Sequence, residues 1–438
     1  METIFAPATA RGRGGVAVIR ISGPGSGGAL EALSGRGRGA PRMAELRELK
    51  DPVSGHVLDQ ALVLFFEGPH SFTGEDVVEL HLHGGVALVD SVVEGLGKIE
   101  GLRLAEAGEF SRRAVENGKF DLSAAEGIAD LIEAETSAQQ AQALQQMKGT
   151  FGALCDEWRD QVVRSLAYVE ADIDFADEDL PEDLAASVLP GLTVLREEMS
   201  GFLADHRGER IRDGIFVAVV GPPNAGKSSL VNALARRDAV IVSEEAGTTR
   251  DVVEVRLKMA GLPVTVCDTA GLREGVGAVE REGIRRARKT AQEADLRVWM
   301  QSAEDAVLDF FGTAEPQDLK LVNKVDLVQN PLAAADIFQL SIKTAVGVGA
   351  FEEALSNSIE KMFGRGEEPL ITRTRHRKEL EACVNALDGA LSLLRVGGET
   401  ALIAEELRHA ARAVGRITGR VDVEELLDVV FRDFCIGK

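Results

Sequence analysis

The chain contains 438 residues, and its 49 Lys and Arg against 71 Asp and Glu give a formal net charge of −22. The length predicts about two to four domains, and 45% hydrophobic with 27% charged residues exclude a wholly disordered protein. No apolar run approaches the roughly 18 residues of a membrane span, and the N-terminus lacks a secretory signal. The four widely spaced cysteines fit neither a disulfide framework nor a CxxC metal site. We therefore expect a cytoplasmic protein with no membrane association.

Short apolar runs in the N-terminal region are typical of β-strands. Residues 16–21, 61–66 and 77–82 are β-branched or aromatic and lie between clusters of Gly and Pro. The stretch from Gly12 to Gly39 holds ten glycines, so we expect it to be mostly loop. Together these patterns predict a mixed α+β region.

Residues 119–213 differ from the rest in composition and in charge. They are rich in Ala, Glu, Gln and Leu, and apolar residues recur at spacings of three and four, as on one face of a helix. The segment holds 8 Lys and Arg against 21 Asp and Glu, so the acidic excess lies mainly here and does not exclude a polyanionic partner elsewhere. Helical patterns return after Pro369, and the region between alternates short strands with helical runs, as in α/β folds.

A phosphate-binding loop follows the first apolar strand of this α/β region. The strand at 215–220 leads into GPPNAGKS at 221–228 and then into a helical run, which is the setting that the G-x-x-x-x-G-K-S motif requires. Glycines let the loop turn its N–H groups toward phosphate oxygens, Lys227 reaches the β- and γ-phosphates, and the Ser228 hydroxyl holds Mg²⁺. The candidate GTP contacts in this loop are Asn224, Ala225, Gly226, Lys227, Ser228 and Ser229.

Two downstream segments supply further candidate contacts. Thr249, in the run GTTRD, can coordinate Mg²⁺ from a mobile loop. Asp268 follows a strand and is placed to orient the metal, and Gly271 can donate its N–H to the γ-phosphate. The next residue, Leu272, stands where a Ras-like enzyme has Gln, and because Leu cannot hydrogen-bond water, another group must position the nucleophile.

The predicted base is guanine. The run Asn323-Lys324-Val325-Asp326 follows a strand, and its carboxylate can accept hydrogen bonds from guanine N1–H and the 2-amino group, a donor pair that adenine lacks. Ser341 and Lys343 flank Ile342 at a position where GTPases usually have Ser-Ala-Lys. A backbone contact to guanine O6 is compatible with this Ile, although its side chain is bulky there.

Over nearly its whole length the chain resembles tRNA-modification GTPases of the MnmE/TrmE family. The N-terminal stretches together with the C-terminal FCIGK are highly specific for that family. The stretches that carry the resemblance are SFTGEDVVELHLHGG (71–85), AEAGEFSRRAVENGKFDLSAAEGIADLI (105–132), GPPNAGKSSLVNAL (221–234), AGTTRD (246–251), DTAGLRE (268–274) and FCIGK (434–438).

The resemblance implies a multidomain fold. Residues 1–118 are expected to form an α+β domain that binds folate and forms a dimer. Residues 119–213 and 366–438 are expected to form one α-helical domain, into which an α/β P-loop (Ras-like) G domain at 214–365 is inserted. Insertion is physically easy when the two ends of the inserted domain lie close together.

The resemblance also implies how hydrolysis is catalysed without a Gln. Family members use K⁺ where others use an arginine finger, with Asn224, Ser243, Glu245 and Thr248 matched to the K⁺ shell. Ser243 and Thr248 are therefore candidate GTP contacts as well. Glu280 matches the residue that positions water, and without the family it reads equally well as a solvated helix charge. K⁺ activation in the family accompanies pairing of two G domains.

For the N-terminal domain, the resemblance implies a site for a tetrahydrofolate derivative, either 5,10-methylene or 5-formyl. Arg20, Glu79 and Lys119 match the ligand contacts, and Lys438 is expected at the same ligand. A carboxylate such as Glu79 can accept hydrogen bonds from pterin N3–H and its 2-amino group, while Arg or Lys suits the anionic glutamate tail. Cys435 is expected to be functionally required, either as nucleophile or as base.

We therefore expect a dimeric, K⁺-activated GTPase that acts with an FAD-containing partner of the MnmG/GidA type. The expected product is aminomethyl or carboxymethylaminomethyl uridine at the wobble position (position 34) of tRNA. The alternative is a GTP-switched RNA-binding or ribosome-assembly factor without modification chemistry. An attached RNA-binding domain would favour the alternative, and the folate domain with its terminal Cys disfavours it.

Basic residues in the C-terminal region have two open interpretations. They form either a surface that contacts tRNA phosphates or an ordinary solvated basic face. Arg416 and Arg420, which follow Gly415 and Gly419, are expected in a turn. The full set is Arg373, Arg375, Arg377, Arg408, Arg412, Arg416 and Arg420.

Overall fold

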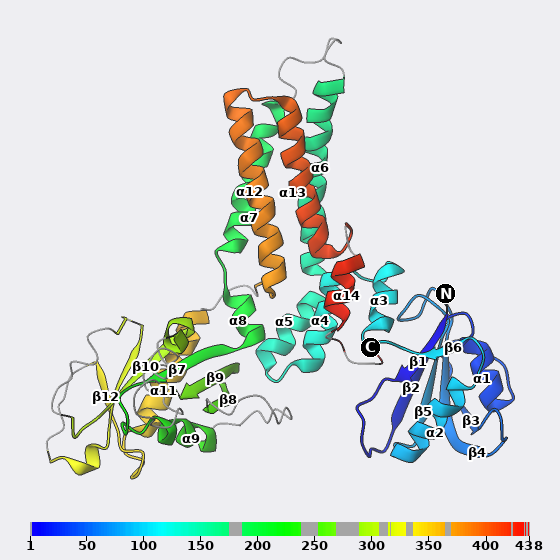
Figure 1. Cartoon of the computed structure of the whole chain (residues 1–438), viewed down its shortest axis with the longest axis horizontal. Helices are drawn as coiled ribbons and strands as arrows, with labels where there is room; N and C mark the ends of the chain where they lie inside the picture. The colour runs from blue at the N-terminus through cyan, green and yellow to red at the C-terminus, as the bar shows by residue number, and fades with distance from the viewer. Residues whose placement is uncertain are drawn as a thin grey trace, which may run out of the picture. The chain divides into compact units, whose positions relative to one another are not determined.

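Figure 1 shows a computed structural model of the chain, in which the elements follow the predicted order of mixed α and β, helices, alternating strands and helices, and helices again. The predicted fold class is confirmed. The chain divides into two compact units, one made of Met1–Ala129, Gln145–Met199 and Lys378–Lys438, the other of Asp130–Leu144 and Ser200–Arg377. The residues that the structure describes are 2–174, 186–237, 253–268, 289–305, 314–315, 317–329, 336–363, 369–421, 424–432, 434 and 437.

The first unit begins with a six-stranded sheet of order β3-β4-β5-β2-β1-β6. Neighbouring strands are antiparallel, except that β1 and β6 are parallel. The three predicted strands correspond to β2, β4 and β5. The bounds are β1 Thr3–Pro7, β2 Ala17–Ser22, β3 Glu45–Lys50, β4 Val57–Phe66, β5 Val77–Leu82 and β6 Leu102–Leu104.

Two helices, α1 (Ser26–Ser34) and α2 (Val86–Gly97), cover one face of this sheet. The α1 helix corrects the prediction that the glycine-rich stretch from residue 12 to 39 is mostly loop. Leu30 and Leu33 are fully buried against the sheet, and this burial outweighs the low helix propensity of the two glycines in the first turn.

The opposite face of the sheet is covered at one end and open at the other. Near β1 and β2, the helix α3 (Glu109–Glu116) covers it, because Phe110 packs with Ile4 and Ala6. Near β3 and β4, Leu46 and Leu62 lie opposite each other and remain 65% and 48% exposed. A site on this face is therefore bounded on one side by α3 and accessible from the other.

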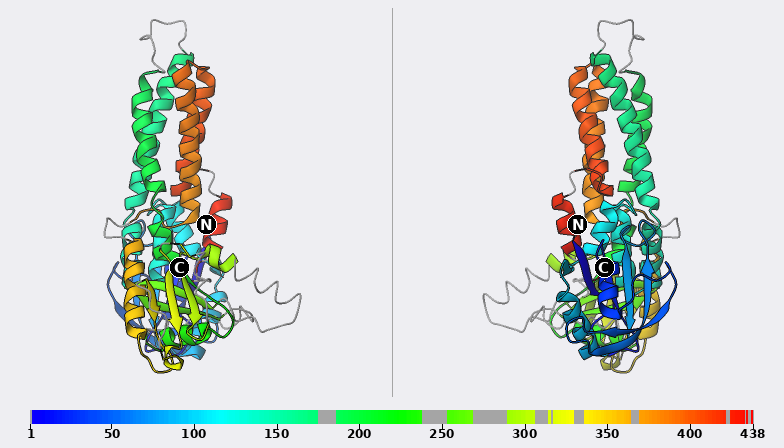
Figure 2. Two further views of the ribbon diagram at one scale, coloured as in Figure 1. Left: turned by 90° about the vertical axis from the view of Figure 1, so that its left-hand side faces the viewer. Right: turned by 90° about the vertical axis from the view of Figure 1, so that its right-hand side faces the viewer.

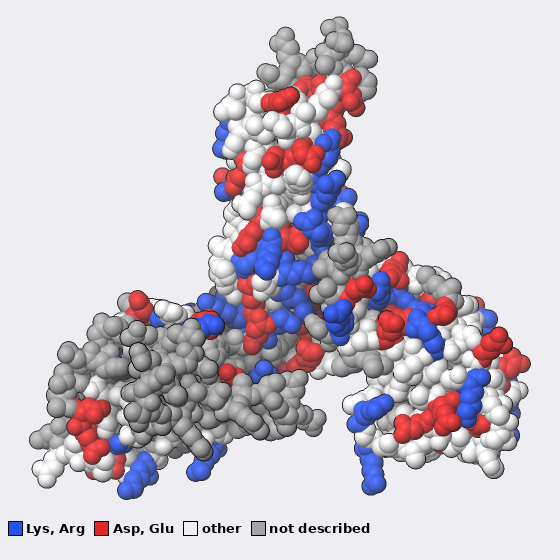
Figure 3. Space-filling view, in the orientation of Figure 1, with Lys and Arg blue, Asp and Glu red and all other residues white. Residues whose placement is uncertain are grey.

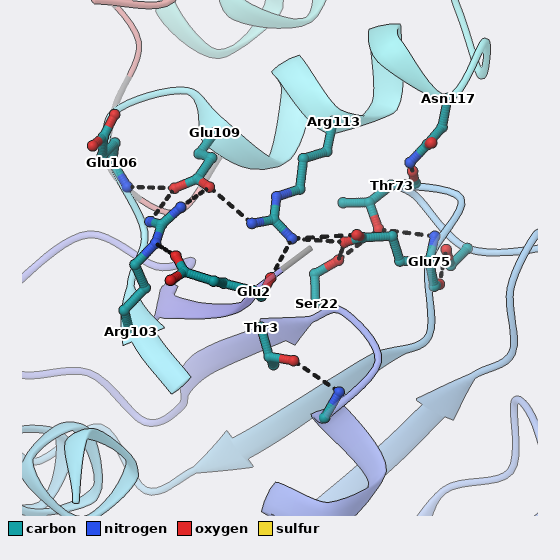
Figure 4. A network of polar contacts seen from close by, with 12 residues as sticks. Glu2, Thr3, Ser22, Thr73, Glu75, Arg103, Glu106, Glu109, Arg113 and Asn117 are labelled. Atoms are coloured by element: carbon teal, nitrogen blue, oxygen red, sulfur yellow. Dashed lines mark hydrogen bonds and ion pairs between the residues drawn. The ribbon is translucent and has the colours of Figure 1, made fainter. Parts of the chain in front are cut away.

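The α3 helix is fastened by an ion-pair network (Figure 4). Glu109 accepts hydrogen bonds from Arg103 at 2.6 and 2.8 Å, from Arg113 at 2.9 Å and from the backbone N–H of Glu106 at 2.9 Å. Burial alone would raise the pKa of the Glu109 carboxyl, but these donors lower it to about 2.

The remainder of the first unit is helical. Figures 1 and 2 show α6, α7, α12 and α13 side by side in a bundle. Helices from before and after the α/β region pack together: Arg196 of α7 pairs with Asp388 of α12 at 2.8 Å, and Arg408 of α13 pairs with Glu170 of α6 at 2.9 Å. The bounds are α6 Thr150–Asp174, α7 Leu189–Leu203, α12 Thr374–Val396, α13 Thr400–Thr418 and α14 Glu424–Arg432, with a 3-10 turn at Ala186–Val188. Two further helices, α4 Leu122–Glu133 and α5 Ser137–Met147, have residues in both units.

The α13 helix continues through Gly415 and Arg416 and ends at Gly419, whose φ is 77°. The predicted turn at Gly415 is therefore wrong. A Cβ atom at Gly415 would lie 2.8 Å from Val421 Cγ2, so glycine at this position lets Val421 pack closely against the helix and does not reverse the chain. No helix in the described part of the chain is long and apolar enough to cross a membrane.

The second unit holds a six-stranded sheet of order β12-β11-β10-β7-β9-β8, parallel except for the β8–β9 pair. Its core is formed by apolar residues of the strands, of α9 and of α11. The bounds are α8 Arg207–Asp213, β7 Ile215–Val220, α9 Lys227–Arg237, β8 Val253–Met259, β9 Leu262–Asp268, β10 Leu296–Ser302, β11 Leu319–Asn323, β12 Ile337–Gln339 and α11 Val348–Phe363, with a 3-10 turn at Val325–Leu327.

Replacement of Glu109 by Gln is expected to destabilise α3 in a pH-dependent way. The folded-state pKa of about 2 lies below the ordinary 4.5, so the carboxylate stabilises the fold above about pH 4.5 and this contribution is lost as the pH falls toward 2. We expect Glu109→Gln to reduce the local free energy of unfolding by about 2 kcal/mol at neutral pH and by less at pH 3.

Hydrogen exchange of the α3 amides, corrected for intrinsic rates at each pH, measures this difference. Glu116→Gln is the control, because Glu116 lies on the same helix and pairs with Arg112 at its surface. If Glu109→Gln lowers the local free energy of unfolding by the same amount at both pH values, the lowered pKa of Glu109 is contradicted.

Candidate functional site

The glycine-rich loop of the second unit joins β7 to α9, as the motif predicts. Asn224 has a φ of 63° and Gly226 a φ of 101°, both in the left-handed region. A side chain at Gly226 would also bring its Cβ to 2.4 Å from Asn323 Nδ2. Only glycine satisfies both demands at this position, and the loop thereby turns directly into the N-terminus of α9.

Lys227, Ser228 and Asp268 meet at the base of this loop. The parallel pairing of β7 with β9 brings the carboxyl end of β9, where Asp268 lies, beside the loop. Ser228 Oγ donates to the Asp268 carboxylate, and Lys227 Nζ donates to the carbonyls of Gly221 and Pro222 at 2.8 and 2.9 Å. Burial lowers the pKa of Lys227, and the Asp268 charge opposes this effect.

Asn323, at the end of β11, connects this loop to the segment after β12. Its Nδ2 donates to the Ala225 carbonyl at 2.9 Å, and its Oδ1 accepts from the Ile342 N–H at 3.3 Å. The Ile342 side chain packs against the apolar core of the unit, so its bulk is accommodated there. Beside it, buried Ser341 accepts from the N–H of Thr344 at 3.2 Å.

The charged residues of the same edge are more exposed. Lys324 has a φ of 63°, and its Nζ lies 3.4 Å from Glu304 Oε2. Asp326, in the 3-10 turn, and Lys343, after β12, are exposed. The uncharged Ser229, in the first turn of α9, is also exposed. The described part of the site thus combines a buried frame with solvent-facing charges.

Several predicted residues lie outside the described part of the chain. They come from the two segments after the phosphate-binding loop that were matched by sequence and from the C-terminal motif. These residues are Ser243, Glu245, Thr248, Thr249, Gly271, Leu272, Glu280, Cys435 and Lys438.

Arg20 and Glu79 form a directly opposed pair on β2 and β5 in the first unit. Arg20 Nε and Nη2 donate to the same Glu79 oxygen at 3.0 and 2.9 Å. The second Glu79 oxygen lies 3.4 Å from His81 Nε2. All three side chains are partly exposed on the open face of the sheet, so the pair presents a carboxylate and a guanidinium to a ligand approaching that face.

Two aromatic residues that the sequence did not single out enclose Arg20. Its Cζ lies 5.1 Å from the ring centre of Phe72 and 5.7 Å from that of Phe110. Phe72 lies in the stretch 71–85 and Phe110 in the stretch 105–132 that resemble the family, and this membership was the only sequence feature that pointed to them. Lys119 contacts the loop between β4 and β5 that carries Phe72: its Nζ donates to the Pro69 carbonyl at 2.6 Å.

Gly437, near the C-terminus, lies close to this domain. Gly437 is buried with a φ of 100°, and a side chain there would bring its Cβ to 2.0 Å from the Pro7 carbonyl at the end of β1. Upstream, Asp428 of α14 pairs with Arg112 of α3 at 2.5 Å, and Phe431 packs with Leu122. The register Ala6↔Arg20 places the end of β1 next to the Arg20 pair.

The basic residues of the C-terminal region are largely ion-paired. Figure 3 shows positive and negative side chains interspersed along the helical bundle. This favours the interpretation of an ordinary ion-paired face over a dedicated phosphate surface. The pairs are Arg373–Asp130, Arg377–Glu209, Arg408–Glu170, Arg416–Glu379 and Arg420–Asp156.

Comparison with known proteins finds relatives along the whole chain. Residues 3–119 match the family model described as "GTP-binding protein TrmE N-terminus", and residues 122–435 match "MnmE helical domain". The chain is similar to the tRNA modification GTPase MnmE of Parvibaculum lavamentivorans, with 54% identity over 440 residues. It is also similar to those of Paramagnetospirillum magneticum and Rhodospirillum rubrum, with 49% identity over 448 and 465 residues. Each of these matches covers all of both chains.

Replacement of Asn323 by Ala is expected to loosen both ends of the nucleotide site. The substitution leaves the Ala225 carbonyl and the Ile342 N–H without their partner, at a cost of about 1–3 kcal/mol in the unfolding free energy of this unit. Guanine-nucleotide affinity should fall with it. Chemical denaturation and equilibrium titration with a fluorescent GDP analogue measure the two effects.

The control is Gln329→Ala, which removes an exposed side-chain amide from the connection between β11 and β12. Its stability and nucleotide affinity should match those of the wild type. Equal stability of the Asn323 and Gln329 variants would contradict the role of Asn323.

Proposed function

Because this chain belongs to the MnmE family of tRNA modification GTPases, we propose that it works as a homodimer with an FAD-containing partner of the MnmG/GidA type. The two proteins together add an aminomethyl or carboxymethylaminomethyl group to C5 of the tRNA wobble uridine. A methylene-tetrahydrofolate supplies the carbon, and GTP hydrolysis drives a conformational cycle. The observation that carries the proposal is the 54% identity to a tRNA modification GTPase over the full length of both chains.

The domain assignment follows from the same proposal. Residues 1–118 are assigned to folate binding and dimerisation, and residues 214–365 to GTP hydrolysis. Residues 119–213 and 366–438 are assigned to the helical domain into which the GTPase domain is inserted.

The phosphate end of the site is assigned to the glycine-rich loop. The Ser228 hydroxyl and the Asp268 carboxylate are hydrogen-bonded to each other, and oxygen donors of this kind suit Mg²⁺. When bound, Mg²⁺ neutralises charge on the β- and γ-phosphates. Lys227 would exchange the carbonyls of Gly221 and Pro222 for phosphate oxygens. Thr249 and the N–H of Gly271 are assigned to the γ-phosphate side.

The guanine end is assigned to Asn323, Lys324 and Asp326 with Ser341 and Lys343. Asn323 holds the Ile342 backbone in place, which supports a backbone contact to guanine O6 that is independent of the Ile side chain. The exposed Asp326 carboxylate is available for the N1–H and the 2-amino group of guanine.

The catalytic assignments rest on the family pattern. Asn224 lies exposed at the left-handed turn of the loop, and its side-chain oxygen is assigned to a K⁺ ion beside the phosphates. Ser243, Glu245 and Thr248 are assigned to the same K⁺ shell, and Glu280 to water. K⁺, when bound, offsets the negative charge that develops between the β- and γ-phosphates.

The folate assignment is supported by the chemistry of the Arg20–Glu79 pair. The Glu79 carboxylate can accept the two pterin donors, and Arg20 and Lys119 suit the anionic tail, to which Lys438 is also assigned from the family pattern. The position of buried Gly437 against Pro7 supports placing Cys435 near the same ligand.

A homodimer is supported by the open face of the N-terminal sheet. Leu46, Leu62 and His81 form one row across three strands, and the two leucines are exposed. Two adjacent exposed leucines on an uncovered sheet face suit an interface, and a second copy of the chain would cover them.

The K⁺ assignment predicts a cation-dependent rate. GTP hydrolysis should be at least about tenfold faster in K⁺ than in Na⁺ at equal ionic strength, since a lost transition-state contact costs at least this much. Asn224→Ala should lose the difference while still binding GDP. Equal rates in Na⁺ and K⁺, measured as phosphate release under single-turnover conditions, would remove K⁺ from the proposal.

The modification chemistry predicts a separation of two activities. Cells that lack this protein should lose the modified wobble uridine, as measured by nucleoside analysis of their tRNA. The wild-type chain should restore it, and Cys435→Ser should fail to do so while its GTPase rate stays unchanged. Unchanged wobble uridines in the deletion strain would overturn the assignment, and full complementation by Cys435→Ser would overturn the role of the thiol.

A further inference from the structure

One loop of the N-terminal domain, residues 68–76, is held in place by side chains of α3 and its C-terminal end. Arg113 Nη1 lies 3.1 and 3.3 Å from the two oxygens of Glu75, and Asn117 Nδ2 donates to the Thr73 carbonyl at 2.7 Å (Figure 4). The two donors lie one helical turn apart on the same face. These contacts couple the position of the loop to that of α3.

Arg113 is the centre of this contact. It is 7% exposed, and besides Glu75 it donates to Glu109 at 2.9 Å and to the Glu2 carbonyl at 2.9 Å. One guanidinium thus joins a loop, a helix and the start of the sheet. A planar fork of donors is needed for this arrangement, and Lys has no equivalent geometry.

The same network reaches the strand that carries Arg20. Ser22 Oγ donates to Glu75 Oε2 at 2.7 Å and lies 2.7 Å from Thr73 Oγ1. Ser22 follows Arg20 by two residues on β2, so both side chains lie on the same face of the sheet.

Arg20 itself is enclosed by residues of the two elements that Arg113 joins. Phe72 directly precedes Thr73 in the loop, and Phe110 precedes Arg113 by one helical turn. Their rings lie 5.1 and 5.7 Å from the Arg20 guanidinium, which leaves it directed at Glu79. A shift of the loop relative to α3 would separate the rings and release Arg20.

We propose that Arg113, through its contact with Glu75, is a positioning residue for the Arg20–Glu79 ligand pair. Arg113 does not touch the ligand; it fixes the loop and α3 so that Phe72 and Phe110 hold Arg20 in its binding orientation. The inference rests on the proposed folate site, because it assigns to that site a supporting residue.

Ligand affinity and loop packing in the full-length chain test the proposal together. Binding of 5-formyltetrahydrofolate is measured by calorimetry for the wild type and for Arg113→Gln, Arg113→Lys and Glu75→Gln, well below each melting temperature. We expect the Kd to rise about tenfold for Arg113→Gln and Glu75→Gln, because small displacements of ligand-contacting groups have effects of this size, and to rise less for Arg113→Lys. Arg36→Gln is the matched control, since Arg36 is exposed just after α1, which packs on the opposite face of the sheet, and its Kd should be unchanged.

A local probe separates positioning from general stability. In a Phe72→Trp background, Arg113→Gln should shift the emission of the introduced tryptophan to longer wavelength, whereas Arg36→Gln should not. The spectrum of the same variant with Phe72 is subtracted, because the chain already contains two tryptophans. If Arg113→Gln does not fold, Glu75→Gln and Arg113→Lys carry the test. Wild-type Kd values in those folded variants, with lowered melting temperatures only, would overturn the positioning role. Failure of the wild-type chain to bind the folate would instead overturn the folate assignment itself.

Discussion

The nucleotide site depends on one buried amide. Asn323 donates to the loop that follows β7 and accepts from the backbone that follows β12, so a single side chain spans two strands of the sheet. Each partner is a backbone group that loses this hydrogen bond when the amide is removed, and the Ala225 carbonyl is buried, which makes the amide costly to replace. The left-handed turn at Gly226 brings the loop close enough for the contact, and the packing of Ile342 into the core holds the other end.

The N-terminal site uses charge where the nucleotide site uses a neutral amide. Arg20 and Glu79 are partly exposed and pair with each other, so a ligand with matching donors and a negative tail can exchange with them without leaving a buried charge unpaired. Behind them, the buried network of Arg113 with Glu75 and Glu109 is fully paired. An exposed pair for exchange and a buried network for support are consistent with a site that must bind and release its ligand.

The net charge of −22 gives no indication of how many arginines are ion-paired. Most arginines of the C-terminal helices lie within ion-pair distance of carboxylates, including some on helices far away in the sequence, such as Arg408 with Glu170. The acidic residues of the segment from 119 to 213 therefore serve partly as partners for these arginines. Because these arginines are already paired with carboxylates, they are poorly suited to bind tRNA by charge alone. We therefore expect the proposed partner protein to contribute more to holding the RNA.

The sequence by itself determined the phosphate-binding loop, Asp268 and Asn323, because each lies at the carboxyl end of an apolar strand and parallel strands end at one edge of a sheet. It also determined the strands that carry Arg20 and Glu79. Only the tertiary structure decided that these two residues, 59 positions apart, are opposed, because strand register depends on the packing of the whole sheet. The same holds for the α1 helix in a glycine-rich stretch, for the rings of Phe72 and Phe110 around Arg20, and for Gly437 against Pro7. Each of these is a contact between distant segments, and local sequence patterns carry no information about which distant segment will cover them.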